Sequence, residues 1–497
     1  MAGTLKTEVS APARLAALRK AHPTPNVTDI AQANLTKGLP SIRVSELISA
    51  LSYALDLTEG RPMGHSVRSC VIGMRIAEEI GLPKSGQADL YYALLLKDAG
   101  CSSNSSRLYH ILNADDIRAK GDLKTKDWTK VGWESLHYAV THVATGSPFP
   151  ERVWRLIRVA ATQQTDSCEL VKIRCERGSS IARKLGFSEM VAKSIHSLDE
   201  HWNGKGYPDG LKKHDIPLGA SIANLSQTLE VFLGAHGAEA ALDAARVRSG
   251  RWFNPELVQA AMSLNARGEL WRDLDQQELI EKVLALEPEE RRLTADETTI
   301  DNICMAFAEI IDAKTPFTYR HSTGVANAAV QIGERLGMPE DERRKLKRAA
   351  LLHDIGKLGV SNAILEKPGK LTAEEFTAVK QHPYHTYEIL RRVPAFAEFS
   401  ADAAAHHERL DGKGYWKGLR GEELTPWARI LAVADVFDAL RAKRPYREAL
   451  PLEKVFSMLS EDAPHALDAK CLRALRETES ANLEEPEAKR ESVEVNR

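Results

Sequence analysis

The segment ALLHDIGKLGV (350–360) places His353 and Asp354 at the end of an apolar run, with Lys357 one helical turn later. An earlier segment, ALLLKDAG (93–100), has the same apolar run and keeps the acidic residue as Asp98, 256 positions before Asp354. Around both segments, apolar residues recur at three- and four-residue steps, and alternating strand patterns are nearly absent. We therefore predict an all-α fold that contains an internal repeat.

The repeat extends outward from these two segments. GHSVRS (64–69) resembles RHSTGV (320–325) at the same offset of 256 positions. EHWNGKGYPDGL (200–211) matches HERLDGKGYWKGL (407–419), where the offset has fallen to 208 positions. The 48-residue difference between the two offsets predicts an insertion in the first copy, near 101–173.

The repeat predicts the organisation of the whole chain. We assign copy one to residues 41–268 and copy two to residues 296–476, with a connector over 269–295. Residues 1–40 are rich in Pro, Thr and Asn, and we expect them to be loosely ordered. Residues 477–497 are charged and poor in apolar residues, which predicts a flexible tail.

Composition excludes several classes of protein. The chain has 497 residues, of which 43% are hydrophobic and 27% charged, and its formal net charge is −2. This neutral balance, with only 6% aromatic residues, argues against binding to DNA or RNA. No apolar run reaches the roughly 20 residues that a membrane-spanning helix needs. The six cysteines form no CxxC pair, which is typical of reduced thiols, so we expect a cytoplasmic protein without membrane insertion.

Copy two gathers the residue types that bind divalent metal ions. Imidazole and carboxylate ligands suit iron, manganese or zinc, and the set is too large for one ion. The candidate ligands are His321, His353, Asp354, His382, His406, His407 and Asp435. Two ions bridged by Asp354 would use all of them, and a two-metal site activates water and stabilises a phosphoryl group under attack. Buried polar groups without partners are costly, so the adjacent pairs His353-Asp354 and His406-His407 favour this interpretation over core packing.

Three basic residues of copy two could contact a phosphate. Lys357 lies one turn after His353 among apolar neighbours, where an ammonium could neutralise phosphate charge or assist a leaving oxygen. Arg444 and Arg447 follow the helix that carries Asp435. Their guanidinium groups suit phosphates and bases, but the sequence predicts salt bridges for them equally well.

Copy two resembles the HD-GYP family of the HD phosphohydrolase superfamily. The matching segments follow in the family's order: HSTGVA (321–326), LLHDIGKLGVSNAILEKPGKLT (351–372), KQHP (380–383), HHERLDGKGYW (406–416) and ILAVADVFDALRAKRPY (430–446). This resemblance implies two tandem HD-domain-like helical bundles. It also implies a metal-dependent phosphodiesterase that hydrolyses cyclic di-GMP to pGpG, and in some members to GMP.

The resemblance also assigns roles to individual residues. It makes the seven candidate ligands the metal ligands, with iron or manganese as the expected ions, and it makes Lys357 and Asp354 catalytic. Gly414, Tyr415, Arg444 and Arg447 would face the nucleotide. The family implies a diguanylate cyclase or another signalling protein as a candidate partner, and a homodimer is compatible with it.

Two positions in copy two depart from the family pattern. Trp416 stands where the family has proline, so another ring such as 3′,3′-cyclic GMP–AMP is an alternative substrate. A scaffold that senses nucleotide without turnover is a further alternative. Phe317 stands where members with three metals carry glutamate, and Glu309 is too far upstream to replace it. We therefore expect two metal ions.

Copy one keeps the motif frame but loses most of the ligands. His65 and Asp98 survive, whereas the remaining ligand positions hold Lys97, Arg174, Leu198, Asp199 and Gln227. Two ligands cannot hold a metal pair, so copy one is predicted to be a degenerate domain in which Lys97 and Arg174 supply fixed positive charge. Its role is either structural packing against copy two or regulation through a bound nucleotide or partner.

Overall fold

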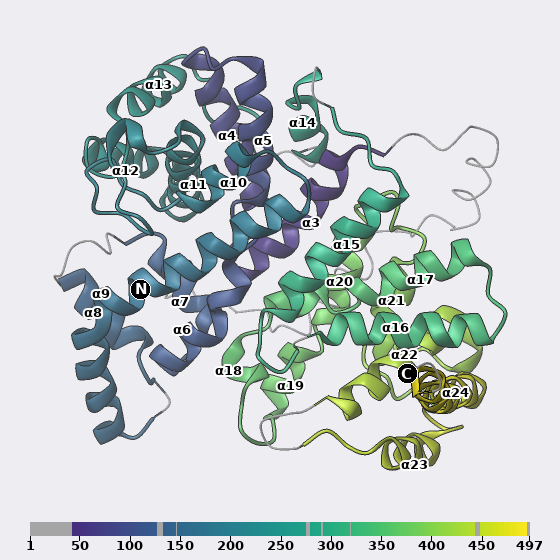
Figure 1. Ribbon diagram of the computed structural model, residues 1–497. Coiled ribbons are helices and arrows are strands. Elements are labelled where there is room, and N and C mark those ends of the chain that lie inside the picture. The colour runs from purple at the N-terminus through teal and green to yellow at the C-terminus, as the bar shows by residue number, and fades with distance from the viewer. Residues whose placement is uncertain are drawn as a thin grey trace, which may run out of the picture. The chain divides into compact units, whose positions relative to one another are not determined.

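The computed structural model describes residues 42–126, 133–145, 147–274, 279–289, 292–318, 320–442 and 448–494 (Figure 1). Across these residues the chain is helical and has no β-strand, so the predicted all-α fold is confirmed. The predicted loosely ordered segment 1–40 lies outside the described residues. No helix within the described ranges is long and apolar enough to cross a membrane.

The helices of copy one and the connector follow one another with short turns. They are α3 (Val44–Thr58), α4 (His65–Glu79), α5 (Lys84–Leu96), η1 (Cys101–Asn104), α6 (Ser105–Leu112), α7 (Asp116–Leu123), α8 (Trp133–His142), α9 (Phe149–Lys184), α10 (Glu189–His196), η2 (Lys213–Asp215), α11 (Leu218–His236), α12 (Ala238–Arg248), α13 (Pro255–Ala266) and α14 (Leu279–Ala285). The predicted insertion therefore forms η1, α6, α7, α8 and the first part of α9.

Copy two has a similar order of helices without the inserted elements. They are α15 (Glu297–Asp312), α16 (His321–Arg335), α17 (Glu340–Leu352), η4 (Ile355–Gly359), α18 (Asn362–Leu365), α19 (Ala373–Val379), α20 (His382–Leu390), α21 (Ser400–Ala404), η5 (Ala405–His407), η6 (Gly421–Glu423), α22 (Pro426–Arg441), α23 (Leu452–Asp462) and α24 (Ala469–Glu494).

The repeat is visible in the bounds of the helices. Helices α4 and α16 have the same length, as do α5 and α17, and each pair is offset by 256 positions at both ends. The equivalent residues Gly81 and Gly337 follow α4 and α16 with φ of 69° and 77°. This left-handed conformation suits glycine and ends both helices in the same way. Helices α11 and α22 begin 208 positions apart, so the second offset also appears in the structure.

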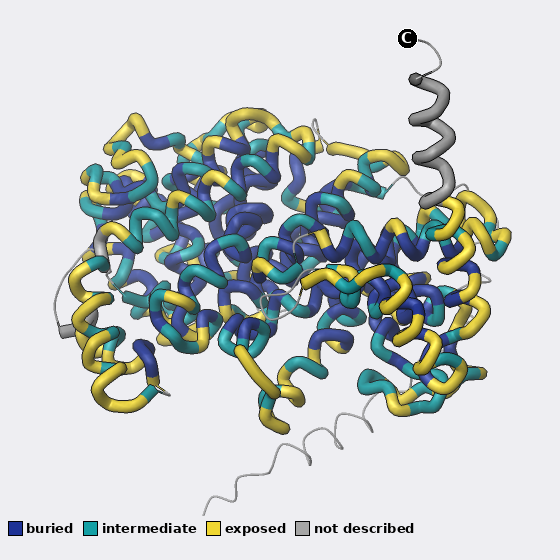
Figure 2. The backbone as a smooth tube through the Cα atoms, turned by 60° about the horizontal axis from the view of Figure 1, so that its bottom comes forward, coloured by how far each residue is buried: buried dark blue, intermediate teal, exposed yellow. Residues whose placement is uncertain are grey.

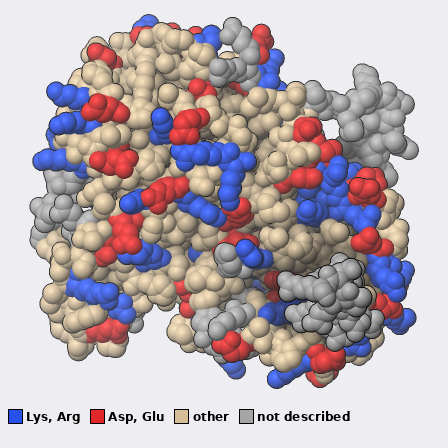
Figure 3. All heavy atoms as spheres, viewed as in Figure 1, with Lys and Arg blue, Asp and Glu red and all other residues tan. Residues whose placement is uncertain are grey.

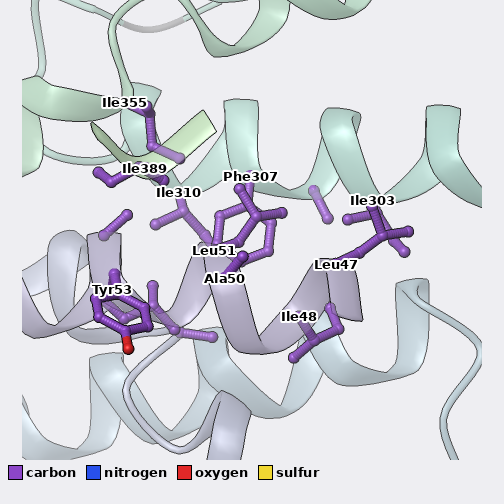
Figure 4. Packing of buried hydrophobic residues seen from close by; sticks show 14 of the residues in the cluster. Leu47, Ile48, Ala50, Leu51, Tyr53, Ile303, Phe307, Ile310, Ile355 and Ile389 are labelled. Atoms are coloured by element: carbon purple, nitrogen blue, oxygen red, sulfur yellow. The ribbon is translucent and has the colours of Figure 1, made fainter. Parts of the chain in front are cut away.

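Helix α3 packs against elements of both copies. Nearly all residues of its sequence, VSELISALSYALDLT, are buried, the small polar Ser45, Ser49 and Ser52 as well as the apolar ones, so the helix is covered on most sides. Figure 4 shows Leu47 and Leu51 of α3 facing Phe307 and Ile310 of α15, with Ile355 of η4 nearby. All five side chains belong to one hydrophobic cluster that continues through both copies. The domain boundaries therefore stay predictions, because the packing runs across them.

Burial and surface charge follow the expected pattern for a helical protein. The buried residues gather on the inward faces of the helices, and the exposed residues lie on their outer faces (Figure 2). Lys and Arg are interspersed with Asp and Glu on the face shown in Figure 3. Residues 477–494 of the predicted flexible tail belong to α24, which continues as helix to Glu494, and the flexibility of the tail stays a prediction. The Ala, Glu, Lys and Arg residues of this segment have high helix propensity.

Candidate metal centre

The structure brings all seven predicted ligands of copy two into one cluster. They come from helix ends and short turns: His321 begins α16, His353 and Asp354 follow α17, His382 begins α20, His406 and His407 end η5, and Asp435 lies within α22. Six of the seven are buried, and His407 is half-buried. Helix ends suit the gathering of ligands from distant parts of the chain, because several segments can meet there without crossing the core.

The seven residues fall into two sets. Asp354, His382, His406 and His407 form the first set, and His321, His353 and Asp435 form the second, with the ligand atoms of each set within 4.8 Å of one another. Asp354 faces both sets. Its Oδ1 lies 3.4 Å from Nε2 of His382 and 3.4 Å from Nε2 of His406. Its Oδ2 lies 3.3 Å from Nε2 of His353 and 3.7 Å from Nε2 of His321.

Main-chain carbonyls fix the tautomer of three of these histidines. His353 Nδ1–H donates to the carbonyl of Ala350 at 2.6 Å, and His382 Nδ1–H donates to that of Val379 at 2.7 Å. His406 Nδ1–H donates in the same way to Ala403 at 2.6 Å. A neutral imidazole that donates through Nδ1 presents a lone pair at Nε2, which is the arrangement that metal-binding histidines adopt.

Several acceptor atoms inside the cluster lack a hydrogen-bond donor among the described residues. The Nε2 atoms of His382 and His406 lie 3.2 Å apart. With the protons on Nδ1, each Nε2 carries a lone pair, and the two lone pairs repel each other. In the same described ranges, His353 Nε2 and Asp354 Oδ1 are buried without a hydrogen-bond partner. Buried acceptors are expensive when unpaired, so the donor set fits a pair of divalent cations between the two sets of ligands.

The carboxylates of the cluster are held in their charged form. Burial by itself would raise the pKa of Asp354, but the neighbouring His353 and Lys357 lower it well below its usual range. The pKa of His321 rises to about 10: burial opposes the rise, but hydrogen bonds to Asp435 and Asp438 outweigh it. The cluster therefore concentrates negative charge, which a bound cation would offset in place of the proton on His321.

Lys357 lies at the edge of the cluster. Its Nζ donates to Asp354 Oδ2 at 2.6 Å, and its side chain is 21% exposed. A half-buried ammonium beside the bridging carboxylate can contact solvent and a ligand at the same time. The structure thus places Lys357 where the sequence predicted it.

Three residues that the sequence analysis missed hold the ligands in position. Thr386 donates its hydroxyl to the carbonyl of His353 at 2.8 Å and accepts from the backbone N–H of Gly356 at 3.1 Å, which fixes the turn after α17. Asp438 lies 2.7 Å from Nδ1 of His321. It stands three residues after Asp435 on α22, a helical spacing that could have identified it. Asp312 is the third of these residues.

Asp312 anchors the start of α16, and an equivalent residue does the same in copy one. Asp312 Oδ1 accepts from the Ser322 hydroxyl at 2.7 Å and from the Ser322 N–H at 3.2 Å. Asp56 accepts from Ser66 in the same way, at 2.7 Å and 2.9 Å. Burial raises the pKa of Asp312 to about 6 and that of Asp56 to about 7.

The GKGYW turn packs against the cluster through its tyrosine. The Tyr415 ring lies 4.8 Å from the ring of His407, measured between centroids. A side chain at Gly414 would overlap with Glu408, which accepts from the backbone N–H of Lys417 at 2.5 Å. Trp416 packs elsewhere, in a small cluster with Ala405, Leu424 and Ala428, and its ring lies 5.5 Å from that of Tyr387.

Of the remaining residues of copy two singled out in the sequence, the structure describes only two. Arg444 and Arg447 lie outside the described residues, so their predicted roles stay predictions. Phe317 is half-buried. Glu309 forms ion pairs with Arg177 and Lys184 of α9, at 3.2 and 2.7 Å, so its carboxylate is engaged with copy one.

In copy one, a lysine ammonium lies among the surviving ligands. Lys97 replaces His353, and its Nζ donates to the Asp98 carboxylate and lies 3.1 Å from Nε2 of His65. Lys124, which comes from the insertion, lies 3.7 Å from Asp98 Oδ1 and 2.8 Å from Glu59 Oε2. Ammonium groups thus lie beside these carboxylates, and Lys97 stands where the sequence predicted a fixed positive charge.

The outer contacts of copy one repeat those of copy two with altered residues. Arg174 replaces His382 and pairs with Asp199, which replaces His407. Glu230 stands at the position of Asp438 and contacts Nδ1 of His65, just as Asp438 contacts His321. Glu230 also accepts from Arg68 Nε at 2.7 Å. The position of Arg68 is taken in copy two by Gly324, where a side chain would overlap with Asp438.

Comparison with known proteins matches both copies to the same family. A family model described as an HD domain matches residues 119–257 and 305–471. The chain is 42% identical over 433 residues to a 3′3′-cGAMP-specific phosphodiesterase of Vibrio cholerae, a match that covers 87% of this chain and 94% of that protein.

A solved structure and a shorter relative agree with this assignment. The crystal structure of a cyclic GMP-AMP specific phosphodiesterase from V. cholerae matches with a TM-score of 0.61 and 38% identity, covering 88% of this chain and 97% of that one. A cyclic di-GMP phosphodiesterase of Thermotoga maritima is 40% identical over 171 residues, which cover 33% of this chain and 46% of that protein.

Proposed function

The chain belongs to the HD-GYP family of the HD phosphohydrolase superfamily, and from this membership we propose that it is a metal-dependent phosphodiesterase of cyclic dinucleotides. Catalysis is assigned to copy two. The observation that carries the proposal is the position of Asp354, whose two carboxylate oxygens face separate sets of histidine nitrogens. We infer that cations bind between these two sets.

The residues of copy two divide the work between metal binding and substrate binding. His321, His353 and Asp435 would hold one ion, His382, His406 and His407 the other, and Asp354 would contribute one oxygen to each. The chemistry that such a pair supplies when bound is the activation of water and the neutralisation of phosphoryl charge. Imidazole and carboxylate ligands together suit iron, manganese or zinc, and among these the family favours iron or manganese.

Lys357 is the protein group best placed to act on the phosphodiester. Its Nζ is 2.6 Å from Asp354, and its side chain reaches solvent. From this position the ammonium can donate a hydrogen bond to a phosphoryl oxygen or a proton to the leaving 3′-oxygen as the ring opens. Tyr415, packed on His407, forms the adjoining wall, and we assign to it and to Gly414 a contact with the nucleotide.

Two cyclic dinucleotides are candidate substrates. We favour 3′,3′-cyclic GMP–AMP, because the relative named for that substrate matches both copies, over 87% of this chain. Cyclic di-GMP, the substrate that the resemblance implied, is the second candidate. The relatives named for it are as similar in sequence but match only about a third of the chain. Because Trp416 packs in an apolar cluster with Ala405, Leu424 and Ala428, we do not assign the choice of substrate to its ring.

One preparation tests the proposal. The protein is purified without oxygen, its iron and manganese are measured, and it is incubated in turn with 3′,3′-cyclic GMP–AMP, cyclic di-GMP and cyclic di-AMP. We expect two metal equivalents per chain and a linear dinucleotide product, formed fastest from 3′,3′-cyclic GMP–AMP. Faster hydrolysis of cyclic di-GMP would reverse the order of the substrates. Failure to hydrolyse any ring, with two metals bound, would refute the proposal.

A further inference from the structure

A cavity of about 410 Å³ lies in copy one. Its volume is in the range of pockets that bind small organic molecules, which is about 300–1,000 Å³. Arg174, Asp199 and Gln227 line it. These three residues stand at the positions of His382, His407 and Asp435, so the cavity reaches the place where copy two has its metal ligands.

The two sides of the cavity differ in chemistry. One part of the lining is polar and includes Glu59 of the repeated fold and Lys120 and Lys124 of the insertion, besides the three residues above. The rest of the lining from the insertion is largely apolar. Its residues include Leu108 and Leu112 of α6, Tyr138 and Ala139 of α8, and Val159 and Leu170 of α9. The insertion thus adds an apolar wall to a pocket that would otherwise be polar.

The charges around the cavity leave a small positive excess. Four basic side chains and three acidic ones line it. Lys124 and Lys120 share Glu59, at 2.8 and 3.7 Å, and Arg174 pairs with Asp199. Asn104 Oδ1 is a buried acceptor without a hydrogen-bond partner within the described part of the chain. The polar side could therefore accept a ligand with a single negative charge and a hydrogen-bond donor.

We propose that this cavity is a regulatory site for an amphipathic organic anion, a molecule with an apolar body and one acidic head group. The body would lie against α6, α8 and α9, and the head group would lie against Arg174, at a former metal-ligand position, and against Lys120 and Lys124. A cyclic dinucleotide fits less well, because it carries two phosphates and two polar bases and would desolvate them against an apolar wall.

The inserted helices that line the cavity also contact copy two. Asp116, the first residue of α7, is fully buried and lies 3.1 Å from Lys314 Nζ. It also accepts from the Ser361 hydroxyl at 2.9 Å and from the Asn362 N–H at 2.6 Å. Lys120 and Lys124, on or just after the same short helix, line the cavity. Ser361 follows the η4 turn that carries Lys357, so α7 connects the cavity to the catalytic turn.

Helix α6 makes a second connection. Ser106 donates to Glu366 at 3.1 Å, and His110 lies 3.1 Å from the same carboxylate. Leu108 and Leu112 of the same helix line the cavity. Figure 1 shows α6 beside α18 of copy two. Occupancy of the cavity would thus act on residues 361–366 through two helices. This regulatory part of the inference rests on the proposed function, whereas the binding part does not.

Calorimetry on the full chain tests the binding site with decanoate as the probe. Ala139→Trp fills the apolar wall, and Val140→Trp is its matched control, because Val140 is the next residue and is 44% exposed. We expect decanoate to bind the wild type and Val140→Trp equally, and to bind Ala139→Trp about tenfold or more weakly. The thermal stability of both variants shows that they fold.

Several results would overturn the binding site. They are absence of decanoate binding to the wild type, equal binding to the two variants, equal binding of decyltrimethylammonium, or tighter binding of a cyclic dinucleotide that the Ala139→Trp change removes. The last result would assign the cavity to nucleotide instead.

The connection to copy two is tested with the same probe. We expect saturating decanoate to change the hydrolysis rate, and the manganese affinity of copy two, by about fivefold. Asp116→Asn and Glu366→Gln should reduce this effect and leave decanoate affinity unchanged. If decanoate binds but changes neither quantity, the regulatory part is wrong. Because manganese affinity is measured separately, a protein that hydrolyses no cyclic dinucleotide would refute the proposed function without deciding this test.

Discussion

Copy two places His353 beside the bridging carboxylate of Asp354, and copy one places Lys97 beside the equivalent Asp98. The helices on either side have matching lengths, α4 with α16 and α5 with α17. In copy two, buried acceptors face one another, which fits the cations proposed above. In copy one, Lys97 places an ammonium group at the same position. The comparison suggests a common requirement for positive charge at the centre of the fold, met by a lysine in copy one and, in our proposal, by metal ions in copy two.

The sharpest test of this comparison changes the two equivalent aspartates. Asp354→Asn removes the carboxylate shared by both sets of ligands, so we expect the metal content to fall and the hydrolysis rate to drop by more than about 100-fold, since outer-shell changes alone cost 10- to 100-fold. Metal analysis and product chromatography measure both effects.

Asp98→Asn is the matched control in copy one. It should keep the full metal content and the activity of each folded molecule. It should also lower the free energy of unfolding by about 3 kcal/mol, because Lys97 and Lys124 lose a buried partner. Loss of metal from Asp98→Asn would mean that copy one also binds an ion, and the comparison would break.

Lys357 of copy two and Lys97 of copy one should also differ in their effect on kcat. Lys357→Met is expected to reduce kcat about 100-fold with metal retained, because a general acid contributes about 10²- to 10⁴-fold. Lys345→Met is the control, since Lys345 pairs with Glu398 on an exposed part of α17. Lys97→Met should leave kcat unchanged and destabilise the fold. An equal loss of kcat in Lys345→Met would contradict the role given to Lys357.

Asp438 and Glu230 are the carboxylates that orient the first histidine of each copy. Their substitutions should show a smaller difference, measured as metal affinity. Asp438→Asn weakens the hold on Nδ1 of His321, so we expect metal affinity to fall about 10-fold. Glu230→Gln changes the equivalent contact to His65, where no metal is expected, and should leave metal affinity unchanged. Competition with a chelator of known affinity measures both, and equal weakening in the two variants would count against a metal-free copy one.

The smallest expected effect is a difference in pH dependence. Asp56 has a pKa of about 7 in the folded protein, raised by burial, against about 4 in an unfolded chain. Its stabilising contribution is therefore complete below about pH 4 and is lost as the pH rises toward 7. Between about pH 5.5 and 7.5 the wild type should lose about 2 kcal/mol more than Asp56→Asn.

Urea unfolding of the metal-free protein measures this difference. Metal removal keeps ligand titration in copy two the same for both proteins. Parallel curves for wild type and Asp56→Asn would show that the Asp56 carboxyl keeps its ordinary pKa.

The sequence was sufficient to predict the all-α fold, the repeat and the seven residues that the structure brings into one cluster. The histidines and aspartates occur at fixed places relative to helix ends, so motif spacing locates them. Thr386 and Asp438 could not be predicted with the same certainty, because a hydroxyl or carboxylate on a helix is common and only the folded contact shows its role. Lys124 was missed for a related reason, since it belongs to the insertion and has no equivalent in copy two.

Helix α3 has a practical consequence for how the protein can be divided. Because Leu47 and Leu51 pack on Phe307 and Ile310, a fragment that starts at residue 296 would expose that apolar surface to water. We expect such a fragment to aggregate. A fragment that ends at residue 268 would expose the α3 side of the same contact, and we expect it to aggregate as well. The first helix of the degenerate copy therefore also covers an apolar surface of copy two.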